Sequence, residues 1–123
     1  MREQLCNPND IAIIDLEKNT QLVGSHELAK EMLQLLAEKL PRDIAVVSQA
    51  YDEQNYANLE LAAHKLVGGC AYCGAPALRM AARALEYAAN DKNPILIQSN
   101  YTTLQQQVAR FKQAMNAILI TDN

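Results

Sequence analysis

Apolar residues recur along most of this chain at steps of three and four, the spacing of one face of an α-helix. The first such segment follows Asp15, a residue suited to cap a helix, and ends near Gly24. Ser25 can cap the next segment, which we expect to end around Leu40 because proline disfavours helical geometry in the residue before it. Pro41 then suits the first turn of a further helix, so the pattern predicts a break between the two.

The second half of the chain shows the same alternation of start signals and amphipathic segments. A polar break precedes Asn55, which can cap a helix that ends near Gly74. Pro76 fits the first turn of the following helix, and the pair Asn93–Pro94 begins the last one. Long amphipathic helices with short connections favour antiparallel neighbours. The sequence therefore predicts an all-α protein, an antiparallel up-down four-helix bundle with a short extra N-terminal helix.

Length and composition set limits on this picture. With 123 residues, we expect a single domain over 1–123 with its core at roughly 11–120. A net charge of −3 without a Lys/Arg cluster argues against nucleic-acid binding, and no apolar run approaches the roughly 18 residues of a membrane span. Three cysteines are an odd number, and Cys6, on the irregular lead-in, is expected to be a free thiol.

One histidine lies within a helical pattern but away from its apolar stripe. At about 100° per residue, His64 lies about 200° from Leu66 and should point towards water. Gly68, one turn further on, removes a side chain that would crowd the imidazole, a group able to act as a nucleophile near neutral pH. Gly69 is on the inner stripe, where close helix packing would explain it.

The same stretch resembles the signature of histidine-containing phosphotransfer (HPt) domains in His64, Lys65, Leu66, Gly68 and Gly74. With Cys70, Tyr72 and Pro76, it is also similar to the C-terminal HPt domain of BarA-type tripartite hybrid sensor kinases. The resemblance implies a phosphorelay intermediate. His64 would accept a phosphoryl group from the phospho-aspartate of a receiver domain and pass it to an aspartate of a response regulator.

The resemblance further implies a carrier rather than an enzyme, since it has no autokinase activity. Its partners would be the receiver domain of a hybrid histidine kinase and a cognate response regulator, with Mg²⁺ held by the receiver and no cofactor or metal bound here. We expect a cytoplasmic monomer without direct membrane contact, or the cytoplasmic C-terminal part of a membrane-anchored sensor kinase. The chain has no Gly-rich nucleotide loop that would bind ATP.

One position departs from the family pattern. The family commonly has lysine three residues after the histidine, where this chain has Val67. The cation that holds the phosphoryl group would then be Lys65, or Arg79 or Arg83 from the next helix. The family's Gln or Glu that hydrogen-bonds the imidazole corresponds to Glu86, which would orient the ring.

A docking surface for the partner is expected around the histidine. Leu61 and Val67 are expected to be apolar residues on the outer side, suited to transient docking. The expected surface consists of residues that flank His64 on the helix: Ala57, Glu60, Leu61, Lys65, Val67, Ala71 and Tyr72.

Two other functions compete with this interpretation. Cys70 and Cys73 have a C-x-x-C spacing, but redox pairs of this kind normally begin a helix after a strand, and a zinc site needs four ligands. Buried thiols are the simpler interpretation. The second competitor is a non-catalytic helical interaction module in which His64 has no chemical role.

Overall fold

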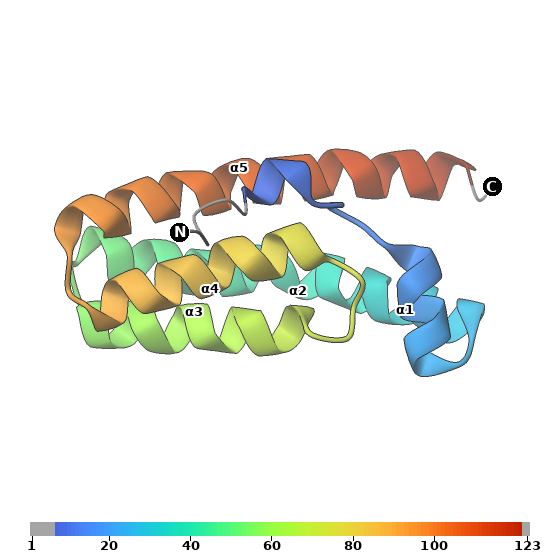
Figure 1. The fold of residues 1–123 in the computed structure, drawn as a ribbon, viewed down its shortest axis with the longest axis horizontal. Helices are drawn as coiled ribbons and strands as arrows, with labels where there is room; N and C mark the ends of the chain where they lie inside the picture. Colours follow the sequence, from blue (N-terminus) through green and yellow to red (C-terminus); the bar gives the residue numbers. More distant parts are fainter. Residues whose placement is uncertain (1–6, 122–123) are drawn as a thin grey trace.

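The computed structural model describes residues 7–121, with side chains described as far as residue 118. Within that range the elements are η2 (Pro8–Asp10), α1 (Leu16–Val23), α2 (His26–Asp52), α3 (Tyr56–Cys70), α4 (Pro76–Asn90) and α5 (Pro94–Thr121). Helices α2 to α5 run alternately in opposite directions along the long axis (Figure 1). The predicted all-α up-down bundle with an extra N-terminal helix is confirmed, while Cys6 and the start of the lead-in lie outside the described residues.

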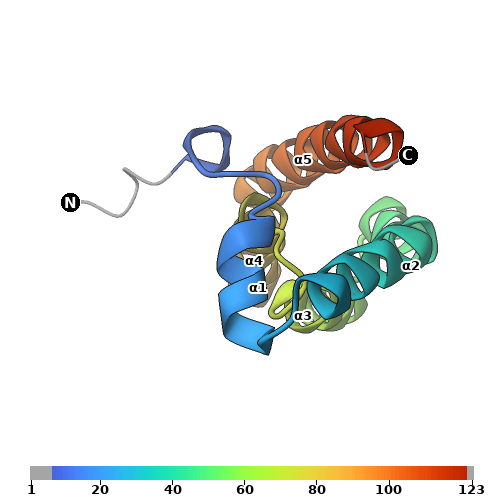
Figure 2. The ribbon, with the colours of Figure 1, turned by 90° about the vertical axis from the view of Figure 1, so that its right-hand side faces the viewer.

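Helices α2, α3, α4 and α5 surround a common interior, which is visible in the end-on view of Figure 2. The interior is filled mainly by leucine, alanine and the single phenylalanine, Phe111. Helix α1 lies outside this four-helix core, where the Asp15 N–H donates to the Gly74 carbonyl in the turn between α3 and α4 at 2.8 Å. Burial of apolar side chains in that interior is what holds the four long helices together.

The predicted helix caps are confirmed. Each cap side chain accepts a hydrogen bond from a backbone N–H that has no partner within the helix. The acceptors are Asp15 for α1, Ser25 for α2, Asn55 for α3 and Asn93 for α5. Gly24 ends α1 in the left-handed conformation, with φ 85°.

The predicted helix end at Leu40 is wrong, because α2 continues through Pro41 to Asp52. Proline lacks an N–H and its ring crowds the carbonyl of Ala37, which lies four residues earlier. Pro41 lies on the exposed side of α2, whereas Leu40 and Val47 are buried on the core side. Since one continuous apolar face packs on the core before and after the proline, tertiary packing outweighs the local preference for a break.

The buried face of α3 differs in part from an inner stripe through Leu66 and Gly69. Leu66 is buried as expected, but Gly69 is only partly buried, whereas Ala63, Val67 and Cys70 are also buried. Helix α3 ends at Cys70 rather than near the predicted end four residues later. A Cβ atom added at Gly69 would meet nothing within 4 Å, so close helix packing does not explain that glycine.

Candidate functional site

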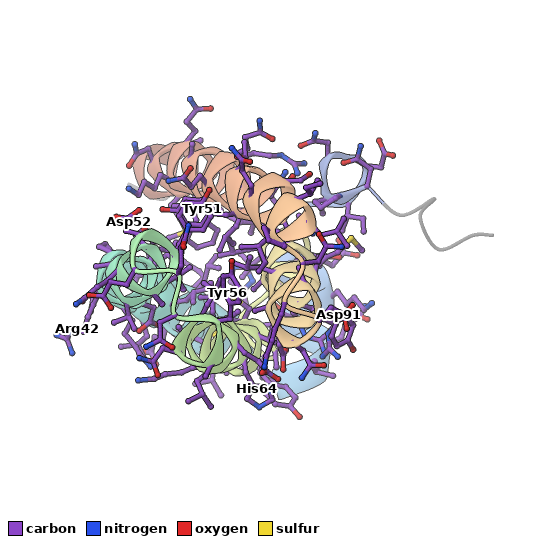
Figure 3. All side chains as sticks on the ribbon, turned by 90° about the vertical axis from the view of Figure 1, so that its left-hand side faces the viewer. Arg42, Tyr51, Asp52, Tyr56, His64 and Asp91 are labelled. Atoms are coloured by element: carbon purple, nitrogen blue, oxygen red, sulfur yellow. The ribbon has the colours of Figure 1, made fainter. Side chains whose placement is uncertain are left out.

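The imidazole of His64 lies on the surface of the bundle, at the boundary between α3 and α4 (Figure 3). Its Nδ1 is 2.7 Å from Oε2 of Glu86, and the side chains are 72% and 16% exposed, respectively. An ionised carboxylate only accepts hydrogen bonds, so in this pair Nδ1 carries the proton. The neutral ring then has its lone pair on Nε2. The predicted contact between Glu86 and the imidazole is confirmed.

A second hydrogen bond joins the same two helices. Asn90 Nδ2 donates to Glu60 Oε2 at 2.9 Å, one turn from the His64–Glu86 pair on both helices. The residue numbers of each pair add up to the same value, as expected for two antiparallel helices in a fixed register. The ring of His64 is therefore held by the packing of α3 against α4 as well as by its own hydrogen bond.

This register shows which cation of α4 lies nearest the imidazole. Arg83 lies level with Val67, which is about 4.5 Å from His64 along the axis of α3. Arg79 lies about 10 Å from His64 along the same axis. Arg83 Nη1 donates to the hydroxyl of Tyr87 at 3.2 Å, and this draws the guanidinium towards the end of α4 that carries Glu86.

Gly68 leaves open surface on α3 one turn after the histidine. It is exposed, and a Cβ atom placed on it would meet nothing within 4 Å. Arg79, Arg83, Glu86 and Asn90 follow one another at steps of four, three and four, so they share one edge of α4. Because Glu86 and Asn90 contact α3 from that edge, Arg83 is on the side of α4 that faces α3, and it also lines a cavity beside the turn between α3 and α4.

Lys65 lies on the other side of the histidine. It lines a groove of about 350 Å³ between α2 and α3, together with Val46, Leu61 and five further residues. The structure therefore separates the three cations that the sequence analysis grouped. Two are on the α4 side of His64, and Lys65 is on the α2 side.

The expected docking residues do not all lie on the surface. Leu61 is 67% exposed, and Ala57 and Tyr72 are also exposed. Glu60 and Ala71 are partly buried. Val67 was expected to be an outer residue, but this is wrong, since its side chain is 6% exposed. The reason is that α3 packs against α2 on one side and α4 on the other, which widens its buried face.

The thiols have environments that oppose thiolate chemistry. Cys70 is buried, and this burial raises the pKa of its thiol to about 12, with the charge of Cys73 acting in the same direction. Burial likewise raises the pKa of Cys73, whose Sγ donates to the Gly69 carbonyl at 3.0 Å. Among the described residues, no group of three or more His, Cys, Asp or Glu side chains could hold a metal ion.

Three residues of this surface were not identified from the sequence. Val46 is half exposed and lines the same groove as Leu61. Its position off the apolar stripe of α2 could have indicated that it is an exposed apolar residue. Asn90 was given no role, although its spacing of four from Glu86 places it on the same face of α4. The contact between Arg83 and Tyr87 had a similar signal, again a spacing of four.

Comparison with known proteins gives one match. The family model described as "Hpt domain" matches residues 31–117, which is more than half of the chain. Searches of curated proteins and of solved structures gave no match. In the part of the chain that the structure describes, no helix is both long enough and apolar enough to span a bilayer.

Proposed function

The chain belongs to the Hpt domain family, and we propose that His64 is the residue that carries its phosphoryl group. Hpt domains are histidine phosphotransfer carriers of two-component phosphorelays and interact with receiver domains. The observation that carries the proposal is the exposed imidazole of His64, whose Nδ1 is held by Glu86.

The proposed reaction begins with a receiver domain phosphorylated on aspartate. Nε2 of His64 attacks the phosphorus in line, the N–P bond forms, and the bond from phosphorus to the aspartyl oxygen breaks, which returns a free carboxylate to the receiver. The ring gains positive charge as the N–P bond forms. Glu86 stabilises that charge through the Nδ1–H hydrogen bond. Transfer to an aspartate of a response regulator is the same step in reverse on a second receiver.

Positive charge near the phosphoryl group is assigned to Arg83. Position 67, where the family commonly has lysine, is here a buried valine. Arg83 lies level with that position on the neighbouring helix, on the edge of α4 that faces α3. The receiver would supply Mg²⁺, which neutralises charge on the transferring group. Arg79, further along α4, and Lys65, on the α2 side, would add to the field rather than contact the phosphoryl oxygens.

Docking is assigned to the exposed apolar residues beside the histidine. Leu61 lies one turn before His64 on α3, and Val46 of α2 lines the same groove. Ala57 and Tyr72 extend the exposed surface of α3 and its C-terminal turn in either direction. An apolar patch of this kind suits a short-lived complex, because the partner must leave after transfer.

The wider setting is also part of this proposal. The donor would be the receiver domain of a hybrid histidine kinase, the acceptor a cognate response regulator, and the domain a cytoplasmic monomer. It would act without autokinase activity, as Hpt domains do.

Transfer from a labelled receiver tests the proposal. The protein is mixed with a receiver domain phosphorylated on its aspartate, and the label on this chain is tested for stability in base and lability in acid. His64→Gln should abolish labelling. His26→Gln is the matched control, since His26 is exposed at the start of α2 and should leave labelling intact. Persistent labelling of His64→Gln would contradict the proposal.

Phosphoramidate, a small phosphoryl donor, separates chemistry from docking. It should label the wild type and His26→Gln on His64, and leave His64→Gln unlabelled. If a receiver transfers no label and phosphoramidate labels His64, the nucleophile is correct and the receiver is not a partner. If neither donor labels His64, the assignment of the phosphoacceptor is wrong.

A further inference from the structure

A second cavity lies between α1, the turn that joins α3 to α4, and the first half of α4. Its volume is about 470 Å³, within the range of small-molecule sites. Neither His64 nor Glu86 lines it. Residues of α1 form one wall of the cavity.

Tertiary hydrogen bonds fix the wall of this cavity. The Asp15 N–H donates to the Gly74 carbonyl at 2.8 Å, and the Ala77 N–H donates to the Ala12 carbonyl at 3.2 Å. Gly74 has φ 77°, and a Cβ atom on it would lie 3.2 Å from Cβ of Asn19. The glycine thus permits α1 to approach the turn closely. The cavity is preformed rather than a gap between mobile segments.

The polar groups of the wall are mainly hydrogen-bond donors. Asn19 is 4% exposed, and its buried Nδ2 has no hydrogen-bond partner, which is rare for a buried donor and unfavourable. Three cations, Lys18, Arg79 and Arg83, line the same cavity. Asp15 is the acidic residue of the wall, and its Oδ1 accepts a hydrogen bond from the backbone N–H of Lys18. In a chain with a net charge of −3, this is a locally basic site.

The remainder of the wall is apolar, with Ile11, Leu22 and Met80 among its residues. An unpaired amide donor and three cations require an acceptor-rich anion, while the apolar side chains require a hydrophobic body. We propose that this cavity binds a small organic anion, with its carboxylate or phosphate group towards Asn19, Lys18 and Arg79 and its apolar part against Ile11, Leu22 and Met80. Arg83 lines this cavity and is also the cation assigned to the phosphoryl group, but this proposal rests on Asn19, Lys18 and Arg79 and not on the phosphotransfer function of His64.

Amide chemical shifts test this site directly. The ¹⁵N-labelled protein is titrated with phenyl phosphate and with phenylacetate, which separate the phosphate and carboxylate headgroups. At least one of them should shift the amides of Asn19 and Gly74 saturably. Inorganic phosphate should bind about tenfold more weakly, because it lacks the apolar body, and the neutral benzyl alcohol should shift neither amide.

Variants link the binding to the named side chains. Asn19→Leu should weaken binding about tenfold while the protein stays folded, since the amide that it removes has no partner in the free protein. Lys18→Gln, on the exposed side of α1, should weaken it about threefold. Arg42→Gln removes the same charge from an exposed position on α2 and should leave affinity unchanged. The absence of saturable shifts at Asn19 and Gly74 with both anions would overturn the proposal, as would equal affinity in all three variants.

Discussion

Nδ1 of His64 lies 2.7 Å from Oε2 of Glu86, and the two side chains belong to different helices. The carboxylate is mostly buried and the imidazole mostly exposed. One ring nitrogen is thus fixed by the bundle and the other is left to solvent, which is the arrangement that a nucleophile approached by a large partner requires.

Replacing this carboxylate should slow transfer without abolishing it. Glu86→Gln keeps a hydrogen-bond acceptor but removes the charge that stabilises the developing imidazolium, so we expect about a tenfold lower rate of phosphorylation by a labelled receiver. Rapid-quench kinetics would measure it. Glu60→Gln is the matched control, because Glu60 makes the equivalent cross-helix hydrogen bond to Asn90. Equal rates for both variants would remove Glu86 from the mechanism.

Arg83 should matter more than the other nearby cations. Arg83→Gln removes the charge level with position 67, and we expect about a five- to tenfold lower transfer rate. Lys65→Gln, on the α2 side of the histidine, should change the rate less than threefold at physiological ionic strength. If Lys65→Gln proves the slower variant, the phosphoryl group approaches from the α2 side and the assignment of Arg83 is wrong.

Local signals in the sequence predicted the local features of the fold. Asp15, Ser25, Asn55 and Asn93 cap helices because a cap depends on a side chain and the backbone two or three residues away. The exposure of His64 was likewise predicted from its angle to the apolar stripe of its own helix.

Features that depend on neighbouring helices were not predictable in this way. Helix α3 packs against two helices, so its buried face includes Val67, which a single apolar stripe placed outside. To decide whether Lys65 or Arg83 lies nearer the phosphoryl group, one must know the register of α3 against α4. The sequence of α3 alone does not give that register. The carboxylate partner was identified through the family resemblance rather than from periodicity.

The interior proline of α2 provides a test of the corrected helix boundary. Pro41→Ala restores a backbone N–H and relieves the crowding of the preceding turn, so we expect the free energy of unfolding to rise by about 1–3 kcal/mol. Chemical denaturation monitored by circular dichroism would measure this. Pro94→Ala, at the first position of α5, is the control and should change stability by less than about 1 kcal/mol. A loss of stability in Pro41→Ala would mean that the proline fits α2 without strain.

The raised thiol pKa values predict a stability change in alkaline solution. Burial raises the pKa of the Cys70 thiol to about 12 in the folded protein from an ordinary value of 9.0, so the unfolded chain loses its proton first as the pH rises. Stability from this group is complete below pH 9 and declines between about pH 9 and 12. Denaturant titrations in the Cys6→Ser background should show this decline, and Cys70→Ala should show a smaller one. Alkylation by iodoacetamide at pH 8 should modify Cys70 of the folded protein slowly, and rapid modification would contradict the buried environment.

Leu61 separates docking from chemistry. It is two-thirds exposed, one turn from His64, and lines the groove shared with α2. A carboxylate at this position would lose its water when the partner binds, which is unfavourable for a charged group. Leu61→Asp should therefore lower the kcat/KM of transfer from a labelled receiver by about tenfold or more. Its effect on labelling by phosphoramidate should be much smaller, because that donor needs no docking surface. Leu35→Asp replaces a similarly exposed leucine in the first half of α2 and should leave both reactions near the wild-type rate. Equal losses for the two donors in Leu61→Asp would show that the substitution disturbs His64 itself, and equal losses for the two variants would place the receiver on a different face of the bundle.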